Sequence, residues 1–206
     1  MEALSIEQIK SLYQVSSPDT RNHLMIRLAF EHAMRASEVC SLWIADFDLT
    51  TPTVYLRLKR LKGSKETVQP LTAETAALLR KWIDSRTYGY VFPTGIAGRP
   101  GDNRQGHITR QTFFLFFQEY CRQVGIPVHL AHPHAAKHAL ASAVIDCIGI
   151  QSTRQYCGHR SMRSTQQYTH SNDAKASAAV HTVLRSVGLD GLSMPLQAVG
   201  AARINA

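Results

Sequence analysis

Nucleophilic and basic side chains recur in four short segments of this chain. Arg35 lies in Met-Arg-Ala-Ser-Glu-Val, His134 and Lys137 in His-Ala-Ala-Lys-His, His159 in Cys-Gly-His, and Tyr168 in Thr-Gln-Gln-Tyr-Thr-His. Metal-free cleavage of a phosphodiester needs a nucleophile, cations for the charge on the phosphoryl oxygens, and an acid for the leaving alkoxide. Basic neighbours favour the phenolate of tyrosine, whose ordinary pKa is about 10. These residue types therefore indicate phosphoryl-transfer chemistry on a polyanion.

The overall charge favours the same kind of partner. The 206 residues include 23 Lys and Arg against 15 Asp and Glu, which gives a net charge of +8, and ten histidines add groups that can be protonated near neutral pH. Nucleic acid is the leading polyanion. Hydrophobic residues make up 44% of the chain and charged residues 18%, which is typical of one globular domain and excludes disorder over most of the length.

The cysteines and the apolar runs indicate the cellular compartment of the protein. Cys40, Cys121, Cys147 and Cys157 have no paired spacing, and the chain begins without a signal-peptide pattern, so reduced thiols in the cytoplasm are expected. No apolar run reaches the roughly 18 residues that span a bilayer. We therefore expect no membrane association.

Periodicity and capping residues predict a mainly α-helical protein with a small antiparallel β-sheet, an α+β class. Ser5 with Gln8 reads as a capping box, and Asp19 as the cap of the next helix. The remaining boundaries come from apolar spacing, Gly and Pro. Helices are predicted near residues 6–13, 24–30, 72–83, 109–124, 134–148, 152–156 and 173–187, and strands at 53–58 and 67–69 around a turn at 62–65.

Three ordered motifs resemble those of the tyrosine recombinase family, the integrases and invertases that rejoin DNA strands. Cys-Gly-His at 157–159 is followed nine residues later by Tyr168, as in the family's LGHSS…T..YTH pattern. Residues 33–38 resemble its GLRISEL box, and residues 62–71 its GKGxKxRxVPL hairpin. The resemblance covers about residues 18–187. It implies the tyrosine recombinase catalytic-domain fold and site-specific cutting and rejoining of DNA through a 3'-phosphotyrosyl intermediate, in integration, excision or inversion.

The resemblance also implies a role for each matching residue. Tyr168 would be the nucleophile, and Arg35 would bind the nonbridging oxygens of the scissile phosphate. His134 would accept a proton or bind the phosphate, and His159 would donate another hydrogen bond to it. Lys62 would protonate the departing 5'-hydroxyl. No cofactor and no metal are implied, because the phosphotyrosyl bond retains the energy of the cut strand.

Lys137 departs from the family, whose second box reads His-x-x-Arg. Lysine keeps the charge but loses the planar two-donor fork of arginine. Three explanations compete: a working natural variant, a natural loss of activity, and a deliberate substitution that traps a DNA complex. The alternatives to an active recombinase are therefore a catalytically impaired DNA-binding homologue and a non-enzymatic DNA-binding regulator. Replacing Lys137 with Arg should preserve or raise cleavage, and a marked fall would show lysine to be the adapted residue.

The domain layout implied by the resemblance is compact. Residues 1–188 form the catalytic domain without a separate N-terminal core-binding domain, as in the fimbrial phase-switch invertases and a few small integrases. Residues 189–206 are a tail that is flexible or docks on a neighbouring protomer. Because half of the usual DNA clamp is missing, the expected working unit is a dimer or tetramer on a double-stranded recombination site, with an accessory DNA-bending protein as a further candidate partner.

Further basic residues are candidates for binding the DNA backbone, and histidines raise the alternative of a metal. His129, His132, His134 and His138 with Cys157 have side chains that suit zinc. The recombinase box accounts for His134 and no Cys pair accompanies it, so no metal site is expected. The DNA-binding candidates are Arg57, Lys59, Arg60, Lys65, Arg110, Arg160 and Arg163.

Overall fold

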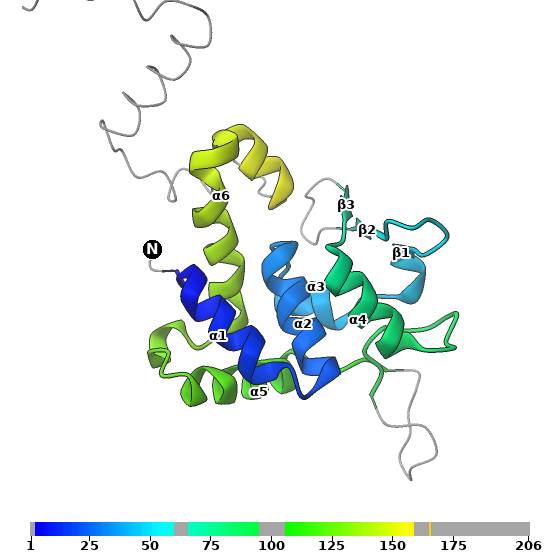
Figure 1. Ribbon diagram of the computed structural model, residues 1–206, viewed down its shortest axis with the longest axis horizontal. Coiled ribbons are helices and arrows are strands. Elements are labelled where there is room, and N and C mark those ends of the chain that lie inside the picture. Colours follow the sequence, from blue (N-terminus) through cyan, green and yellow to red (C-terminus); the bar gives the residue numbers. More distant parts are fainter. Residues whose placement is uncertain (1–2, 60–65, 95–105, 159–164, 166–206) are drawn as a thin grey trace, which may run out of the picture. The chain divides into compact units, whose positions relative to one another are not determined.

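The computed structural model describes residues 3–59, 66–94, 106–158 and 165, all within the first of two compact units, Met1–Thr169 (Figure 1). The helices are α1 (Ile6–Ser16), α2 (Thr20–Glu31), α3 (Ala36–Cys40), α4 (Ala73–Ile83), α5 (Arg110–Gln123) and α6 (Pro133–Tyr156), with the 3-10 helices η1 (Ile44–Asp46) and η2 (Val128–Leu130) and the strands β1 (Phe47–Asp48), β2 (Tyr55–Leu58) and β3 (Thr67–Pro70). No helix in this described part is both long and apolar enough to cross a bilayer. The predicted helix at 173–187 and the tail at 189–206 lie outside it.

The first two helices begin at the residues that the sequence predicts as caps. The Ser5 hydroxyl oxygen accepts a hydrogen bond from the Gln8 backbone N–H at 3.1 Å, and the Gln8 side-chain oxygen accepts from the Ser5 N–H at 2.9 Å. The Asp19 carboxylate accepts from the Asn22 N–H at 2.9 Å. Each side chain satisfies backbone donors that have no partner within the first turn of a helix. Both capping predictions are confirmed.

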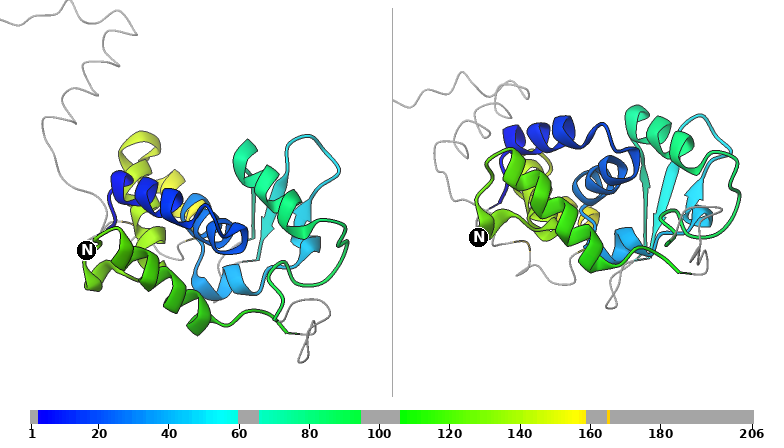
Figure 2. Two further views of the ribbon diagram at one scale, coloured as in Figure 1. Left: turned by 60° about the horizontal axis from the view of Figure 1, so that its bottom comes forward. Right: turned by 90° about the horizontal axis from the view of Figure 1, so that it is seen from below.

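Helix α2 is the centre of the domain. It contacts α1, α3, α4, α5 and α6, and all of its residues from Asn22 to Ala29 are buried (Figures 1 and 2). Helix α4 lies beside the three-stranded sheet in both views of Figure 2. A helix that is surrounded by other elements buries its polar residues too, and these need partners inside the protein.

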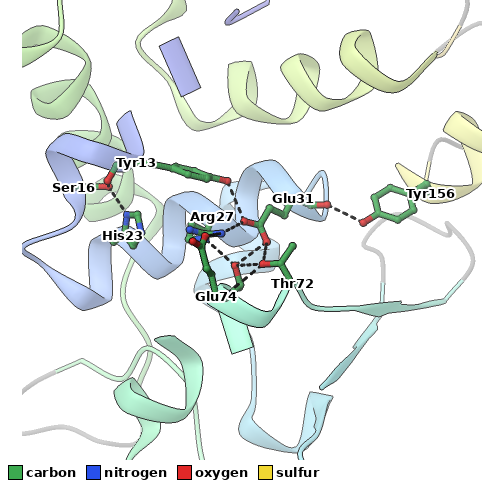
Figure 3. Close-up of polar contacts among 9 residues, drawn as sticks. Tyr13, Ser16, His23, Arg27, Glu31, Thr72, Glu74 and Tyr156 are labelled. Atoms are coloured by element: carbon green, nitrogen blue, oxygen red, sulfur yellow. Dashed lines mark hydrogen bonds and ion pairs between the residues drawn. The ribbon is translucent and has the colours of Figure 1, made fainter. Parts of the chain in front are cut away.

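Arg27 of α2 has such partners from three helices, shown in Figure 3. Its guanidinium lies 2.9 Å from the Glu31 carboxylate, 2.8 Å from that of Glu74, and 2.8 Å from the Thr75 hydroxyl. It also lies over the Tyr13 ring at 4.7 Å from the ring centre. Burial and the Glu31 carboxylate raise the pKa of the Tyr13 phenol, which keeps its hydroxyl as a donor to Glu31 at 3.3 Å. One buried cation thus connects α1, α2 and α4.

Replacing Arg27 with Met is expected to lower the free energy of unfolding by about 3 kcal/mol, because the largely buried Glu31 carboxylate would lose its cation. The matched control is Glu74→Gln. The Glu74 side chain is 77% exposed against 9% for Arg27, so its removal should cost less than about 1 kcal/mol. Urea unfolding measures both. Equal losses in the two variants would show that Arg27 is not the centre of this network.

The sheet is antiparallel with strand order β1-β2-β3. Leu56 pairs with Gln69, and Leu58 with Thr67, so β2 and β3 form the predicted hairpin around residues 59–66. The third strand, β1, was not predicted, and neither was α3. Both are too short to show a hydrophobic period, because two residues hold no alternation and five hold little more than one helical turn.

Helix α6 has the predicted start, interruption and end. Its N-cap is His132, whose side chain accepts from the Ala135 N–H at 3.1 Å, and Pro133 occupies the first turn, where its missing N–H costs nothing. Gly149 adopts φ 74° and ψ 165° and divides the helix into two parts that run in different directions (Figure 1). Gly158 ends it with φ 62°. The separate helices predicted at 134–148 and 152–156 are therefore confirmed.

Candidate active site

Arg35 lies between α2 and α3, and the carboxylate of Glu38 fixes its position. Glu38, whose side chain is 3% exposed, accepts a hydrogen bond from the Arg35 backbone N–H at 2.8 Å. Its other oxygen accepts from Arg35 Nη1 at 2.9 Å. The Arg35 side chain is 30% exposed, so part of the guanidinium is open to a ligand while one end is fixed. An anchored, partly exposed arginine is suited to bind an oxyanion.

The turn that brings the chain to Arg35 contains an unusual backbone conformation. Ala33 is fully buried and has φ 48°, in the left-handed region that favours glycine. The family pattern resembled here, GLRISEL, has glycine at this position. The conformation reverses the chain at the end of α2, and Met34 N–H bonds the Ala29 carbonyl at 3.1 Å. Arg35 is thus placed at a sharp, tightly bonded turn.

His134 lies in the first turn of α6 and is an exposed residue. Its pKa is nevertheless lowered below the usual 6.5, most of all by partial desolvation of the ring and next by the charge of Lys137. His132 and Arg35 lower it further, and only the Glu38 carboxylate raises it. These effects show that Arg35, Glu38 and Lys137 lie within electrostatic reach of His134. A neutral imidazole beside two fixed cations can accept a proton.

Lys137 lies one helical turn after His134 and is 1% exposed. Its Nζ donates a hydrogen bond to the Cys157 carbonyl at 3.0 Å, across the interruption at Gly149. Cys157 is itself buried and caps the end of α6. The lysine therefore connects the first part of α6 to the segment that leads into His159. A buried ammonium at this position supplies charge from within the protein rather than from its surface.

The sequence pattern that defines the phage integrase family, whose members are tyrosine recombinases, matches residues 2–175. The chain belongs to this family. Type 1 fimbriae regulatory protein FimB of Escherichia coli (strain K12) is 33% identical over 177 residues, which cover 82% of this chain and 84% of FimB. Tyrosine recombinase XerC of Actinobacillus pleuropneumoniae is 28% identical, covering 81% of this chain and 54% of XerC. The recombinase described here spans about half the length of XerC.

Solved recombinase structures share the fold. The XerA recombinase superposes with a TM-score of 0.66 at 27% identity, covering 90% of this chain and 65% of XerA. The XerH site-specific recombinase bound to difH substrate, in a pre-cleavage complex, gives a TM-score of 0.69 at 20% identity and covers 86% of this chain and 53% of XerH. The predicted class, mainly α with a small antiparallel sheet, is confirmed as that of a tyrosine recombinase catalytic domain.

The structure brings together three of the six residues that the resemblance assigns to catalysis, namely Arg35, His134 and Lys137. Lys62, His159 and Tyr168 lie outside the described residues. Of the DNA-binding candidates, Arg57 and Lys59 are exposed on and directly after β2, and Arg110 is exposed at the start of α5. Arg57 lies 3.5 Å from Glu66, an exposed pair of little energetic value. Arg60, Lys65, Arg160 and Arg163 lie outside the described residues.

Two residues of this tyrosine recombinase site were not assigned a role from the sequence. Glu38 holds Arg35, and its signal was the Arg-x-x-Glu spacing of an N-cap and the third residue of a helix. His138 is buried, and its ring meets the His134 ring edge-on with centres 4.2 Å apart. Helical spacing of four residues predicts that the two share a face but not which of them is buried.

Metal-ligating side chains do not gather in the described part of the chain. Across residues 3–59, 66–94 and 106–158, no three His, Cys, Asp or Glu side chains lie close enough together to hold an ion. His132 instead caps α6, and His134 and His138 contact one another. Of the four histidines that could suit zinc, His132 is thus accounted for by helix capping, and His134 and His138 by the site around Arg35.

Proposed function

We propose that this tyrosine recombinase is a site-specific DNA recombinase that cuts and rejoins strands through a 3'-phosphotyrosyl intermediate on Tyr168. The observation that carries the proposal is the arrangement of Arg35, His134 and Lys137. An arginine anchored by a buried carboxylate and a buried lysine both lower the pKa of the same histidine by their charge. Fixed cations of this kind stabilise the charge that develops on a phosphoryl group.

In this mechanism the Tyr168 oxygen attacks the scissile phosphorus and the bond to the 5'-oxygen breaks. His134 takes the phenol proton, and Lys62 gives a proton to the 5'-oxygen, so that a neutral hydroxyl leaves. Arg35 and His159 bind the nonbridging oxygens through the step. Rejoining is the reverse reaction with a 5'-hydroxyl from another strand. Protons and bonds balance without a cofactor.

The working unit belongs to the proposal. We assign residues 1–188 to the catalytic domain and residues 189–206 to contact with a neighbouring protomer. The substrate is a double-stranded recombination site, consistent with the net charge of +8 and with the DNA-bound state of XerH. We propose assembly as a dimer or tetramer on DNA, because linked protomers bind neighbouring half-sites more tightly than separate ones do. We also assign the protein to the cytoplasm, since its proposed substrate is DNA.

The test is a nicked suicide substrate that carries the recognised site, obtained by selecting bound duplexes from a random pool. Cleavage releases a short fragment beside the nick, so the strand cannot be rejoined and the enzyme stays attached. We expect a DNA adduct that survives denaturation, with the modified peptide containing Tyr168. Saturated DNA binding without any adduct would contradict the proposal and favour a regulator.

Substitutions of Lys137 distinguish an active enzyme from a catalytically impaired homologue. Replacing Lys137 with Met, which is similar in size, should lower adduct formation by about 10²-fold, because one cation of the phosphate site is removed. Lys137→Arg keeps the charge and a donor for the Cys157 carbonyl, so cleavage should be equal to or above that of the native protein. Adduct formation, DNA binding and thermal unfolding are measured for both variants.

The outcomes for the Lys137 variants differ in meaning. A fall in Lys137→Arg as large as that in Lys137→Met would show that the buried lysine is the adapted residue. An adduct in Lys137→Arg but not in the native protein would identify an impaired homologue. Unchanged cleavage in Lys137→Met would remove Lys137 from the catalytic set.

A further inference from the structure

Gln69 of β3 is a buried amide, 2% exposed, whose two ends bind different parts of the chain. Its Nε2 donates a hydrogen bond to the Tyr156 carbonyl at 2.9 Å, and its Oε1 lies 2.9 Å from Nδ1 of His32. A backbone carbonyl only accepts, so the amide nitrogen must face Tyr156 and the oxygen must face His32. His32 therefore carries its proton on Nδ1 and donates it to Gln69.

These contacts join three of the segments to which catalytic residues have been assigned. His32 precedes Arg35 by three residues, and Tyr156 precedes His159 by three. Gln69 itself follows Lys62 by seven residues, on the strand that returns from the Lys62 turn. The Gln69 side chain is thus bonded to the residues that precede Arg35 and His159 in the chain. Gln69 itself belongs to the hairpin that contains Lys62.

The surrounding contacts make this connection rigid. The Tyr156 hydroxyl donates to the Glu31 carbonyl at 2.8 Å, as Figure 3 shows, so Tyr156 is bonded to the end of α2 and to β3 at once. Strand β3 is at an edge of the sheet, and β2 pairs with it on its other side. The Gln69 side chain therefore bonds an edge strand of the sheet to the end of α2 and to α6. Loss of the amide would remove a donor from the part-buried Tyr156 carbonyl, which is costly.

We infer that Gln69 is a positioning residue. It holds the β2–β3 hairpin, and with it Lys62, in a fixed position relative to the segments that contain Arg35 and His159. The inference rests on the proposed function, because Lys62 is the acid of that mechanism. Gln69 does not contact DNA in this role. It acts by keeping the Lys62 ammonium within reach of the 5'-oxygen, where small displacements have large effects on rate.

The experiment compares two suicide substrates that differ in one atom. In the second, sulfur replaces the scissile 5'-oxygen, and a thiolate leaves without a proton because thiols are far more acidic than alcohols. Gln69→Met, similar in size but apolar, should cleave the oxygen substrate about tenfold more slowly than the native protein, as expected for a misplaced acid. It should cleave the sulfur substrate at the native rate. Gln69→Asn, whose amide is too short to reach both partners, should show the same selective defect and covers the case in which the Met variant does not fold.

Two further variants calibrate the result. Lys62→Ala should lose about 10²-fold on the oxygen substrate and recover on the sulfur substrate. Asn22→Ala removes a part-buried hydrogen bond, from Asn22 Nδ2 to the Tyr120 hydroxyl at 3.2 Å, in the first turn of α2 and thus at the end of that helix away from His32. It should cleave both substrates normally.

Equal slowing of both substrates by Gln69→Met, or no slowing of either, would overturn the inference while leaving the proposed function intact. Failure of the sulfur substrate to recover Lys62→Ala would overturn the inference through its assumed acid. If the native protein forms no adduct with either substrate, the proposed function fails, and the inference fails with it.

Discussion

Tyr168→Phe is expected to abolish the covalent adduct and leave DNA binding unchanged. The substitution removes one oxygen atom, the nucleophile of the proposed step, and retains the ring. No neighbouring group can replace it at the same place, because the attacking atom must lie in line with the leaving 5'-oxygen. The measurement is denaturing electrophoresis of the suicide-substrate reaction, with binding followed separately by gel shift at the same protein concentration.

The matched control is Tyr156→Phe, which changes the described tyrosine that is nearest to Tyr168 in the sequence. The Tyr156 hydroxyl donates to the Glu31 carbonyl, whereas Gln69 bonds the backbone carbonyl of Tyr156, which the substitution keeps. We expect this variant to lose about 1 kcal/mol of stability and to form the adduct. An adduct that persists in Tyr168→Phe would remove Tyr168 as the nucleophile, and its loss in Tyr156→Phe alone would move that role to Tyr156.

Arg35→Ala is expected to lower the rate of adduct formation by about 10³-fold at saturating protein, since it removes a fixed cation from the phosphate. Arg35→Lys keeps a charge but loses the fork and the hold of Glu38 on the guanidinium, so a loss of about 10²-fold is expected. Because both rates are measured on bound DNA, they report the cleavage step rather than affinity.

Arg122 of α5 supplies a control with the same residue type and the same pairing. Arg122 and Glu119 form an ion pair three residues apart at 2.7 Å, as Arg35 and Glu38 do at 2.9 Å, but both partners are exposed. Arg122→Ala should leave cleavage unchanged. If Arg35→Ala weakens binding but cleaves bound DNA at the native rate, Arg35 is a DNA contact and not part of the catalytic set.

The sequence predicted well those elements whose ends are set by capping residues, proline or glycine within a few positions. Ser5, Asp19 and Pro133 begin helices because their own side chains or rings suit the first turn, and Gly149 and Gly158 interrupt and end α6 because they adopt positive φ. Neighbouring atoms alone decide these features. Strand β1 and helix α3 were missed because they are too short to carry a pattern and exist through contacts with distant segments.

The sequence by itself determined the family, the order of its motifs and the departure at Lys137. Only the tertiary structure decided what surrounds these residues: Glu38 behind Arg35, the buried bond from Lys137 to Cys157, and the attachment of β3 to α6 through Gln69. The physical reason is the range of the interactions. Caps and turns depend on adjacent residues, whereas burial and the partner of a buried polar group depend on which distant segments pack together, and Gln69 and Tyr156 are 87 residues apart in the chain.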